Sequence, residues 1–133
     1  MLIIRKEQEK EFAEIALRQF EESMVVHLNH FFPEECKALG RKGTVEAIHH
    51  ALERAGHYGF VSERDICLYM DVMFAFGRDF DEDPDLPWAK EVLNDEALSR
   101  PLERIDKLYD VAMEKAEQAR GIKPVRRGPE DEE

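Results

Sequence analysis

The clearest helix signal in the chain is the stretch Ser62-Glu63-Arg64-Asp65-Ile66-Cys67-Leu68-Tyr69-Met70-Asp71-Val72-Met73-Phe74-Ala75-Phe76-Gly77. Its first four residues have the form of a capping box, in which a serine caps the helix and an acidic residue follows three positions later. Apolar side chains then recur at helical spacing, namely Ile66, Tyr69, Met70, Met73 and Phe74. Gly77 is expected to end this helix.

On the N-terminal side, the same spacing predicts a long helix from about Arg5 to Phe31. Pro33 follows it and is expected to open a short helical turn that ends near Gly40. A second long helix is predicted to begin at Thr44, which would serve as its N-cap, and to stop at Gly56.

On the C-terminal side, Pro87 to Leu93 is predicted to form a short helix. A last long helix is expected to follow a cap at Ser99 and to end at Gly121. No stretch alternates Val, Ile or Thr as a strand would. The expected fold class is therefore all-α, an irregular bundle of about four main helices plus short helices.

The length and composition predict a single domain with a real core. The chain has 133 residues, of which 43% are hydrophobic, and this fraction is ordinary for a globular protein. The final stretch contains two prolines, two glycines and the acidic end Glu130-Asp131-Glu132-Glu133. We expect one helical domain over residues 1–120 and a disordered acidic tail over 121–133.

The overall charge excludes several classes of partner. The formal net charge is −11 and the sequence pI is about 4.9. Nucleic-acid backbones and anionic membranes require a basic surface, so neither is an expected partner. No apolar run has the length of a signal-peptide core or a membrane span, and Cys36 and Cys67 form no disulfide framework. These features predict a reduced, cytoplasmic protein.

The acidic charge is concentrated between the helix predicted over residues 62–77 and the last long helix. Residues 78–99 contain eight acids and two bases, together with the only tryptophan. Connections that mix apolar rings with concentrated charge often carry intermolecular contacts. We expect apolar anchors flanked by carboxylates that steer a basic partner. The candidate partner-binding residues are Asp79, Phe80, Asp81, Asp83, Asp85, Leu86 and Trp88.

Aromatic residues at two places in the chain have a structural interpretation. Trp88 follows Pro87 and could be a core side chain that fixes the loop, or a partner anchor of the kind enriched at interface hot spots. Tyr58 and Phe60 flank Gly59 between two helices, where packing into the core at a tight turn is expected.

The sequence predicts neither a metal site nor a catalytic site. The alternating aspartates from Asp79 resemble the start of a calcium loop, but Pro84 replaces the glycine at its sixth position and Lys90 the glutamate at its twelfth. The histidines lack the spacing of a zinc site. Cys36 follows two glutamates, which disfavour a thiolate. We therefore expect no cofactor, no small-molecule substrate and no enzymatic activity.

Four sequence elements together resemble a known family. They are Ile4-Arg5-Lys6-Glu7-Gln8, His27-Leu28 with Phe32-Pro33, Ala55-Gly56-His57-Tyr58-Gly59 with Ser62-Glu63-Arg64-Asp65, and Phe76-Gly77-Arg78-Asp79-Phe80-Asp81 with Pro87-Trp88-Ala89. The combination is similar to small helical bacterial proteins encoded beside type VI secretion spike, PAAR-tip and effector genes. The resemblance covers about residues 3–115, and its last block is the most specific. It implies a cytoplasmic accessory protein and supplies no catalytic residues.

The expected function is therefore that of a non-enzymatic chaperone, co-chaperone or adaptor. Its partner would be a secreted effector or a PAAR/spike tip protein of a type VI secretion system. The main alternative is an immunity protein that neutralises a cognate toxin, because an acidic loop suits the basic cleft of a toxin that acts on nucleic acid. A metal-dependent enzyme that uses the histidines and the aspartates is the third hypothesis.

Overall fold

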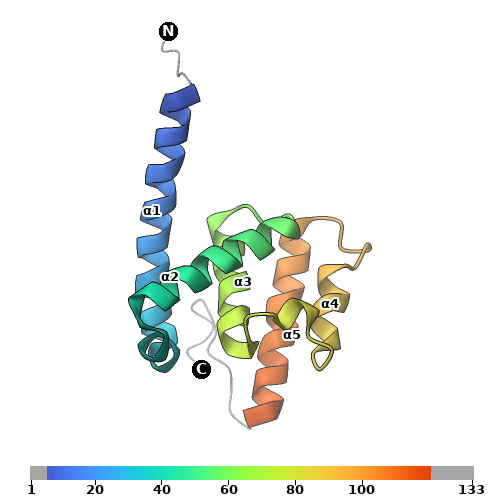
Figure 1. Ribbon diagram of the computed structural model, residues 1–133. Coiled ribbons are helices and arrows are strands. Elements are labelled where there is room, and N and C mark those ends of the chain that lie inside the picture. The colour runs from blue at the N-terminus through green and yellow to red at the C-terminus, as the bar shows by residue number, and fades with distance from the viewer. Residues whose placement is uncertain (1–5, 121–133) are drawn as a thin grey trace, which may run out of the picture. The chain divides into compact units, whose positions relative to one another are not determined.

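The computed structural model describes residues 6–120, and within them the fold is all-α (Figure 1). Five α-helices and one 3-10 turn follow one another, and no strand occurs in this part of the chain. Their bounds are α1 Lys6–Phe31, α2 Pro33–His57, α3 Glu63–Phe76, η1 Phe80–Glu82, α4 Pro87–Leu93 and α5 Pro101–Arg120. The predicted fold class is confirmed. The predicted tail, residues 121–133, lies outside the described residues.

The chain divides into two compact units, Met1–His50 and Ala51–Glu133. The boundary falls inside α2, so this helix contributes to both. The first unit contains α1 and the first part of α2. The second contains the end of α2 and all later elements. The single domain over residues 1–120 stays a prediction.

In the first unit, α1 and α2 are joined by ion pairs between their side chains. Arg41 pairs with Glu22, and His49 contacts Glu21. The predicted turn near Gly40 is present, because this residue has non-helical backbone angles inside α2. The prediction of Thr44 as an N-cap is wrong. Its hydroxyl lies one turn inside the helix and donates to the carbonyl oxygen of Gly40 at 2.8 Å.

The second unit is built around α3, as the sequence predicts. The backbone N–H of Asp65 donates to the Ser62 hydroxyl oxygen at 3.1 Å, which confirms the predicted N-cap. At the other end Gly77 has a φ of 124°, a conformation that L side chains rarely adopt. It therefore ends the helix where the sequence indicates.

The core of the second unit lies between α3 and the elements that follow it. Helix α3 packs on α5, and α4 packs on both α5 and η1 (Figure 1). Several of its largest side chains are almost fully buried, namely Phe60, Leu68, Tyr69, Met70, Phe80, Ile105 and Leu108. The acidic connection is consequently not an independent loop. Its first turn, η1, inserts Phe80 into the core and fixes the residues beside it.

Candidate functional site: an acidic groove and the buried carboxylate beside it

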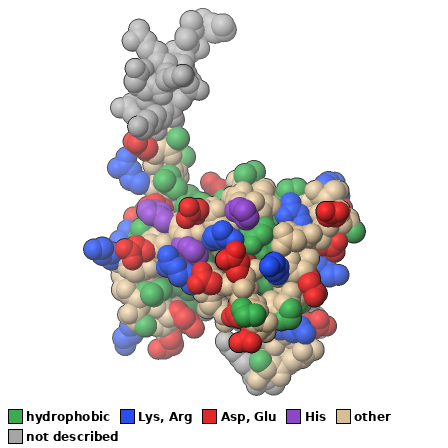
Figure 2. Space-filling view, turned by 45° about the vertical axis from the view of Figure 1, so that its right-hand side comes forward, with side chains coloured by type: hydrophobic (Ala, Val, Ile, Leu, Met, Phe, Trp, Pro, Cys, Tyr) green, Lys and Arg blue, Asp and Glu red, His purple; other side chains and the backbone are tan. Residues whose placement is uncertain are grey.

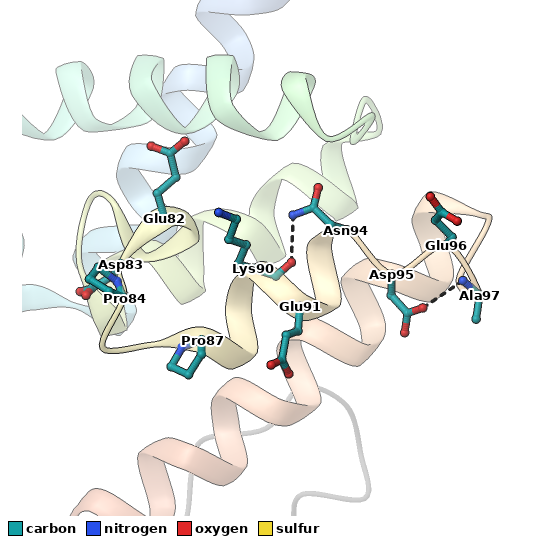
Figure 3. Close-up of a pocket in the computed structure, with 10 residues that line it drawn as sticks. All are labelled: Glu82, Asp83, Pro84, Pro87, Lys90, Glu91, Asn94, Asp95, Glu96 and Ala97. Atoms are coloured by element: carbon teal, nitrogen blue, oxygen red, sulfur yellow. Dashed lines mark hydrogen bonds between the residues drawn. The ribbon is translucent and has the colours of Figure 1, made fainter.

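A groove of about 780 Å³ lies on the surface of the second unit (Figure 3). Its lining comes from η1, from α4 and from the turns that follow each of them. We call it the acidic groove, because five carboxylates and one ammonium group line it. The lining residues are Glu82, Asp83, Pro84, Pro87, Lys90, Glu91, Asn94, Asp95, Glu96 and Ala97.

Local hydrogen bonds hold the two turns that frame the acidic groove. Asp83 Oδ1 accepts from the backbone N–H of Asp85 at 2.9 Å. Asp95 Oδ1 accepts from the backbone N–H of Ala97 at 2.9 Å (Figure 3). Aspartate side chains commonly stabilise turns in this way. Each of these two carboxylates therefore shapes its own turn and adds negative charge to the groove.

Negative charge is concentrated in the groove. On the face shown in Figure 2, Asp and Glu side chains are interspersed with Lys and Arg. In the acidic groove Lys90 is the single basic residue against five acids. Negative charges held close together attract cations and repel anions. The groove is thus suited to a positively charged ligand.

Behind the groove wall, Asp81 is held by two side chains from the end of α2 and the residue after it. Arg54 donates to Asp81 Oδ2 from Nε at 2.9 Å and from Nη2 at 2.7 Å. The Tyr58 hydroxyl donates to the same oxygen at 2.9 Å. Only 2% of the Asp81 side chain and 24% of the Arg54 side chain are exposed. We call these three residues the Asp81 clasp.

The electrostatics of the clasp follow from its geometry. Hydrogen bonding to Asp81 raises the pKa of Arg54 further above its already high usual value. Burial, followed by the hydrogen bond to Asp81, raises the pKa of the Tyr58 hydroxyl. Charge-assisted hydrogen bonds of this kind are about twice as strong as neutral ones. At neutral pH Arg54 therefore keeps its positive charge and Tyr58 keeps its proton, so that both remain donors to Asp81.

Aromatic rings surround the clasp and join it to the core. The Tyr69 ring lies 5.0 Å from the Phe80 ring and 6.3 Å from the Tyr58 ring, measured between centroids. Burial, followed by the charge of Asp81, raises the pKa of Tyr69 well above its usual value. The Tyr69 hydroxyl is buried and meets the geometry of a hydrogen bond with none of the described residues, although the nearby Arg54 guanidinium opposes the rise in its pKa. Arg104 supports the opposite side by donating to the Tyr58 carbonyl oxygen at 2.7 Å.

The candidate partner-binding residues fall into three groups in the structure. Asp83 lines the acidic groove. Asp79 and Asp85 are exposed, and Leu86 and Trp88 are half-buried, but none of these four lines the groove. The Trp88 ring packs edge-to-face on Phe76, with centroids 5.1 Å apart.

Phe80 and Asp81 form the third group and require a correction. Phe80 and Asp81 are each only 1% exposed. Phe80 is therefore a core side chain in this conformation, and Asp81 is the acceptor of the clasp. Neither side chain is exposed at the surface in this conformation. One oxygen of Asp81, Oδ2, accepts three hydrogen bonds from Arg54 and Tyr58.

Most of the residues that line the groove were not identified from the sequence, nor were two of the three clasp residues, Arg54 and Tyr58. The groove acids Glu82, Glu91, Asp95 and Glu96 belong to the acidic stretch over residues 78–99, so the charge count was the available signal. The clasp partners are far away in the sequence, and no local pattern connects them. Burial raises the pKa of the Cys36 thiol, which agrees with the view that this cysteine is not an activated nucleophile.

No protein-family model, curated protein or solved structure was found that matches this chain. No helix in residues 6–120 combines the length and the apolar character needed to cross a bilayer.

Proposed function

We propose that the protein is a non-enzymatic cytoplasmic accessory protein that binds another protein through the acidic groove. The observation that carries the proposal is the groove lining of five carboxylates around a single lysine. Such a surface recognises a lysine- or arginine-rich segment, and it accelerates encounter through long-range attraction. The identity of the partner as an effector or PAAR/spike tip protein of a type VI secretion system rests on the sequence resemblance alone.

The exposed and half-buried candidates would extend this contact beyond the groove. Asp79 and Asp85 would add to the attraction of a basic partner. Leu86 and Trp88 retain partial exposure and would supply apolar contact area. Phe80 and Asp81 are not part of the proposed binding surface, because both side chains are buried.

The test compares two variants that remove equal charge from different places. Asp83→Asn with Glu91→Gln removes two negative charges from the acidic groove. Asp110→Asn with Glu114→Gln removes two from exposed positions on α5. Asn at position 83 keeps the oxygen that accepts the turn hydrogen bond.

Each protein would be titrated with a purified effector encoded by an adjacent gene. A fluorescent lysine-rich peptide would serve as a generic probe. We expect the groove variant to bind more weakly through slower association, and wild-type binding to weaken with added salt. The α5 variant should bind nearly as well as wild type. Equal losses in both variants would show that only net charge matters and would refute the groove as the binding surface.

The immunity hypothesis uses the same acidic groove against a basic toxin cleft. The immunity role and the accessory role can be separated by expressing a toxin encoded by an adjacent gene in the cytoplasm. An immunity protein restores growth of the host, whereas an accessory protein changes the abundance or export of the effector. The groove variant should lose whichever activity is found.

A further inference from the structure

We propose that Arg54 is a positioning residue for the acidic groove: through Asp81 it holds Glu82 and Asp83 in place and so sets how long a cationic ligand stays bound. This inference rests on the proposed binding function. The clasp itself can be tested without any ligand.

The connection between clasp and groove is covalent and short. Asp81 lies in η1, and the next two residues, Glu82 and Asp83, form part of the groove lining. Arg54 Nη2 also lies 3.5 Å from Glu82 Oε2, so the same guanidinium faces one groove carboxylate directly. Any displacement of Asp81 therefore moves this wall of the groove.

The clasp is costly to open. If Asp81 moved away, Arg54 Nε and the Tyr58 hydroxyl would lose the acceptor that they share. Arg54 Nη2 would keep only its longer contacts with the Tyr58 hydroxyl at 3.2 Å and with Glu82 Oε2 at 3.5 Å. The neighbouring Tyr69 hydroxyl already lacks a partner among the described residues. Partly buried donors left without an acceptor carry a desolvation penalty. The wall is consequently held in one position before a ligand arrives, and such preorganisation favours tight binding.

A purely electrostatic role for Arg54 predicts the opposite effect. If Arg54 merely reduced the negative potential of the groove, its removal would strengthen the binding of a cation. If it positions the groove wall, removal would weaken binding through faster dissociation, despite the more negative groove. The sign of the change therefore separates the two roles.

The experiment uses the full chain with Arg54→Met, Arg54→Lys and Tyr58→Phe. Arg64→Met is the matched control, because Arg64 pairs with Asp65 and Asp106, away from the groove lining. Hydrogen exchange of the 78–86 amides is measured first. The dissociation rate of a fluorescent lysine-rich peptide is measured second, at fixed ionic strength.

We expect Arg54→Met to raise exchange across residues 78–86 and to speed peptide dissociation several-fold. Arg54→Lys keeps the positive charge but should give exchange and dissociation rates between those of wild type and Arg54→Met. The reason is that an ammonium group cannot reproduce the two guanidinium hydrogen bonds. Tyr58→Phe removes one of three donors and should show a smaller change in a protein that stays folded. Arg64→Met should leave both measurements close to wild type.

Two outcomes would overturn the inference. One is unchanged or slower peptide dissociation in both Arg54→Met and Tyr58→Phe. The other is wild-type exchange at residues 78–86 in these variants. Failure of the wild-type protein to bind either the peptide or the effector would instead refute the proposed function. In that case the exchange measurement alone would still decide whether the clasp holds the wall.

Discussion

Removal of the hydroxyl from Tyr58 should lower stability, whereas removal of the hydroxyl from Tyr69 should not. The two residues lie in the same aromatic cluster, with ring centroids 6.3 Å apart. The Tyr58 hydroxyl donates to Asp81 Oδ2 at 2.9 Å. The Tyr69 hydroxyl is buried without a hydrogen-bond partner among the described residues. Tyr58→Phe and Tyr69→Phe are therefore identical chemical changes in different hydrogen-bonding environments.

The magnitudes follow from these environments. A hydrogen bond to a charged group contributes about 1.5–3 kcal/mol. Tyr58 is only half-buried, so Tyr58→Phe should lower the free energy of unfolding by about 1–2 kcal/mol. A buried polar group without a partner costs about 1–3 kcal/mol. Tyr69→Phe removes that group and should leave the free energy of unfolding unchanged or raise it by about 1 kcal/mol.

Urea unfolding followed by far-UV circular dichroism measures both values. The slope of the free energy with denaturant should stay the same in each variant, because neither substitution changes the surface exposed on unfolding. A loss of more than about 1 kcal/mol in Tyr69→Phe would show that its hydroxyl is satisfied in solution. Equal effects of the two substitutions would refute the distinction between the hydroxyls.

The raised pKa values of Tyr58 and Tyr69 predict that stability falls at high pH. Both tyrosines have folded-state pKa values above the unfolded value of about 10. The folded chain therefore holds their protons at a pH where the unfolded chain has released them. Their contribution to stability is complete below about pH 10 and declines as pH rises above it. Tyr69→Phe should make this decline less steep in the same unfolding assay, and an unchanged slope would contradict the raised pKa.

Three further predictions concern stability and can be measured by the same unfolding experiment. Ser62→Ala removes the N-cap of α3 and should cost about 1 kcal/mol; no loss would show that the cap is not needed. Gly59→Ala should destabilise by about 1 kcal/mol or more, because Gly59 has a φ of 88°. Its control, Gly56→Ala inside α2, should be neutral or stabilising, since nothing lies within 4 Å of the added carbon. Trp88→Ala removes a half-buried ring from Phe76 and should cost about 2 kcal/mol, whereas a fully stable variant would favour a partner anchor.

Helix boundaries were predictable where the residue that signals a boundary in the sequence also has the capping side chain or the backbone angles that end a helix. Ser62 and Gly77 bound α3 as expected, because a cap hydroxyl and a positive φ are properties of single residues. The end of α2 was predicted one residue early. Gly56 remains helical, and the left-handed conformation occurs at Gly59 instead. A glycine permits a helix to stop but does not require it.

The candidate site was predictable only as a charged region. The four alternating aspartates from Asp79 to Asp85 look equivalent in the sequence, and their spacing does not reveal which is buried. The difference is made by Arg54, which lies 27 residues before Asp81. Phe80 was assigned to the surface for the same reason, since its ring partner Tyr69 belongs to an earlier helix. Long-range pairings of this kind are determined by the packing of whole elements.

Because Asp81 is buried and Asp83 and Asp85 are not, the aspartates must be tested separately. Replacement of Asp81, Asp83 and Asp85 together would remove the acceptor charge of the clasp along with the surface charge, so weaker binding could come from a displaced groove wall. Asn at position 83 retains the oxygen that receives the turn hydrogen bond, and Asp85 is exposed. A variant with Asn at positions 83 and 85 alone therefore changes charge while it keeps the local backbone bonding. Asp81 belongs instead with Arg54 and Tyr58, where loss of binding must be compared with exchange of the 78–86 amides before any electrostatic role is assigned to it.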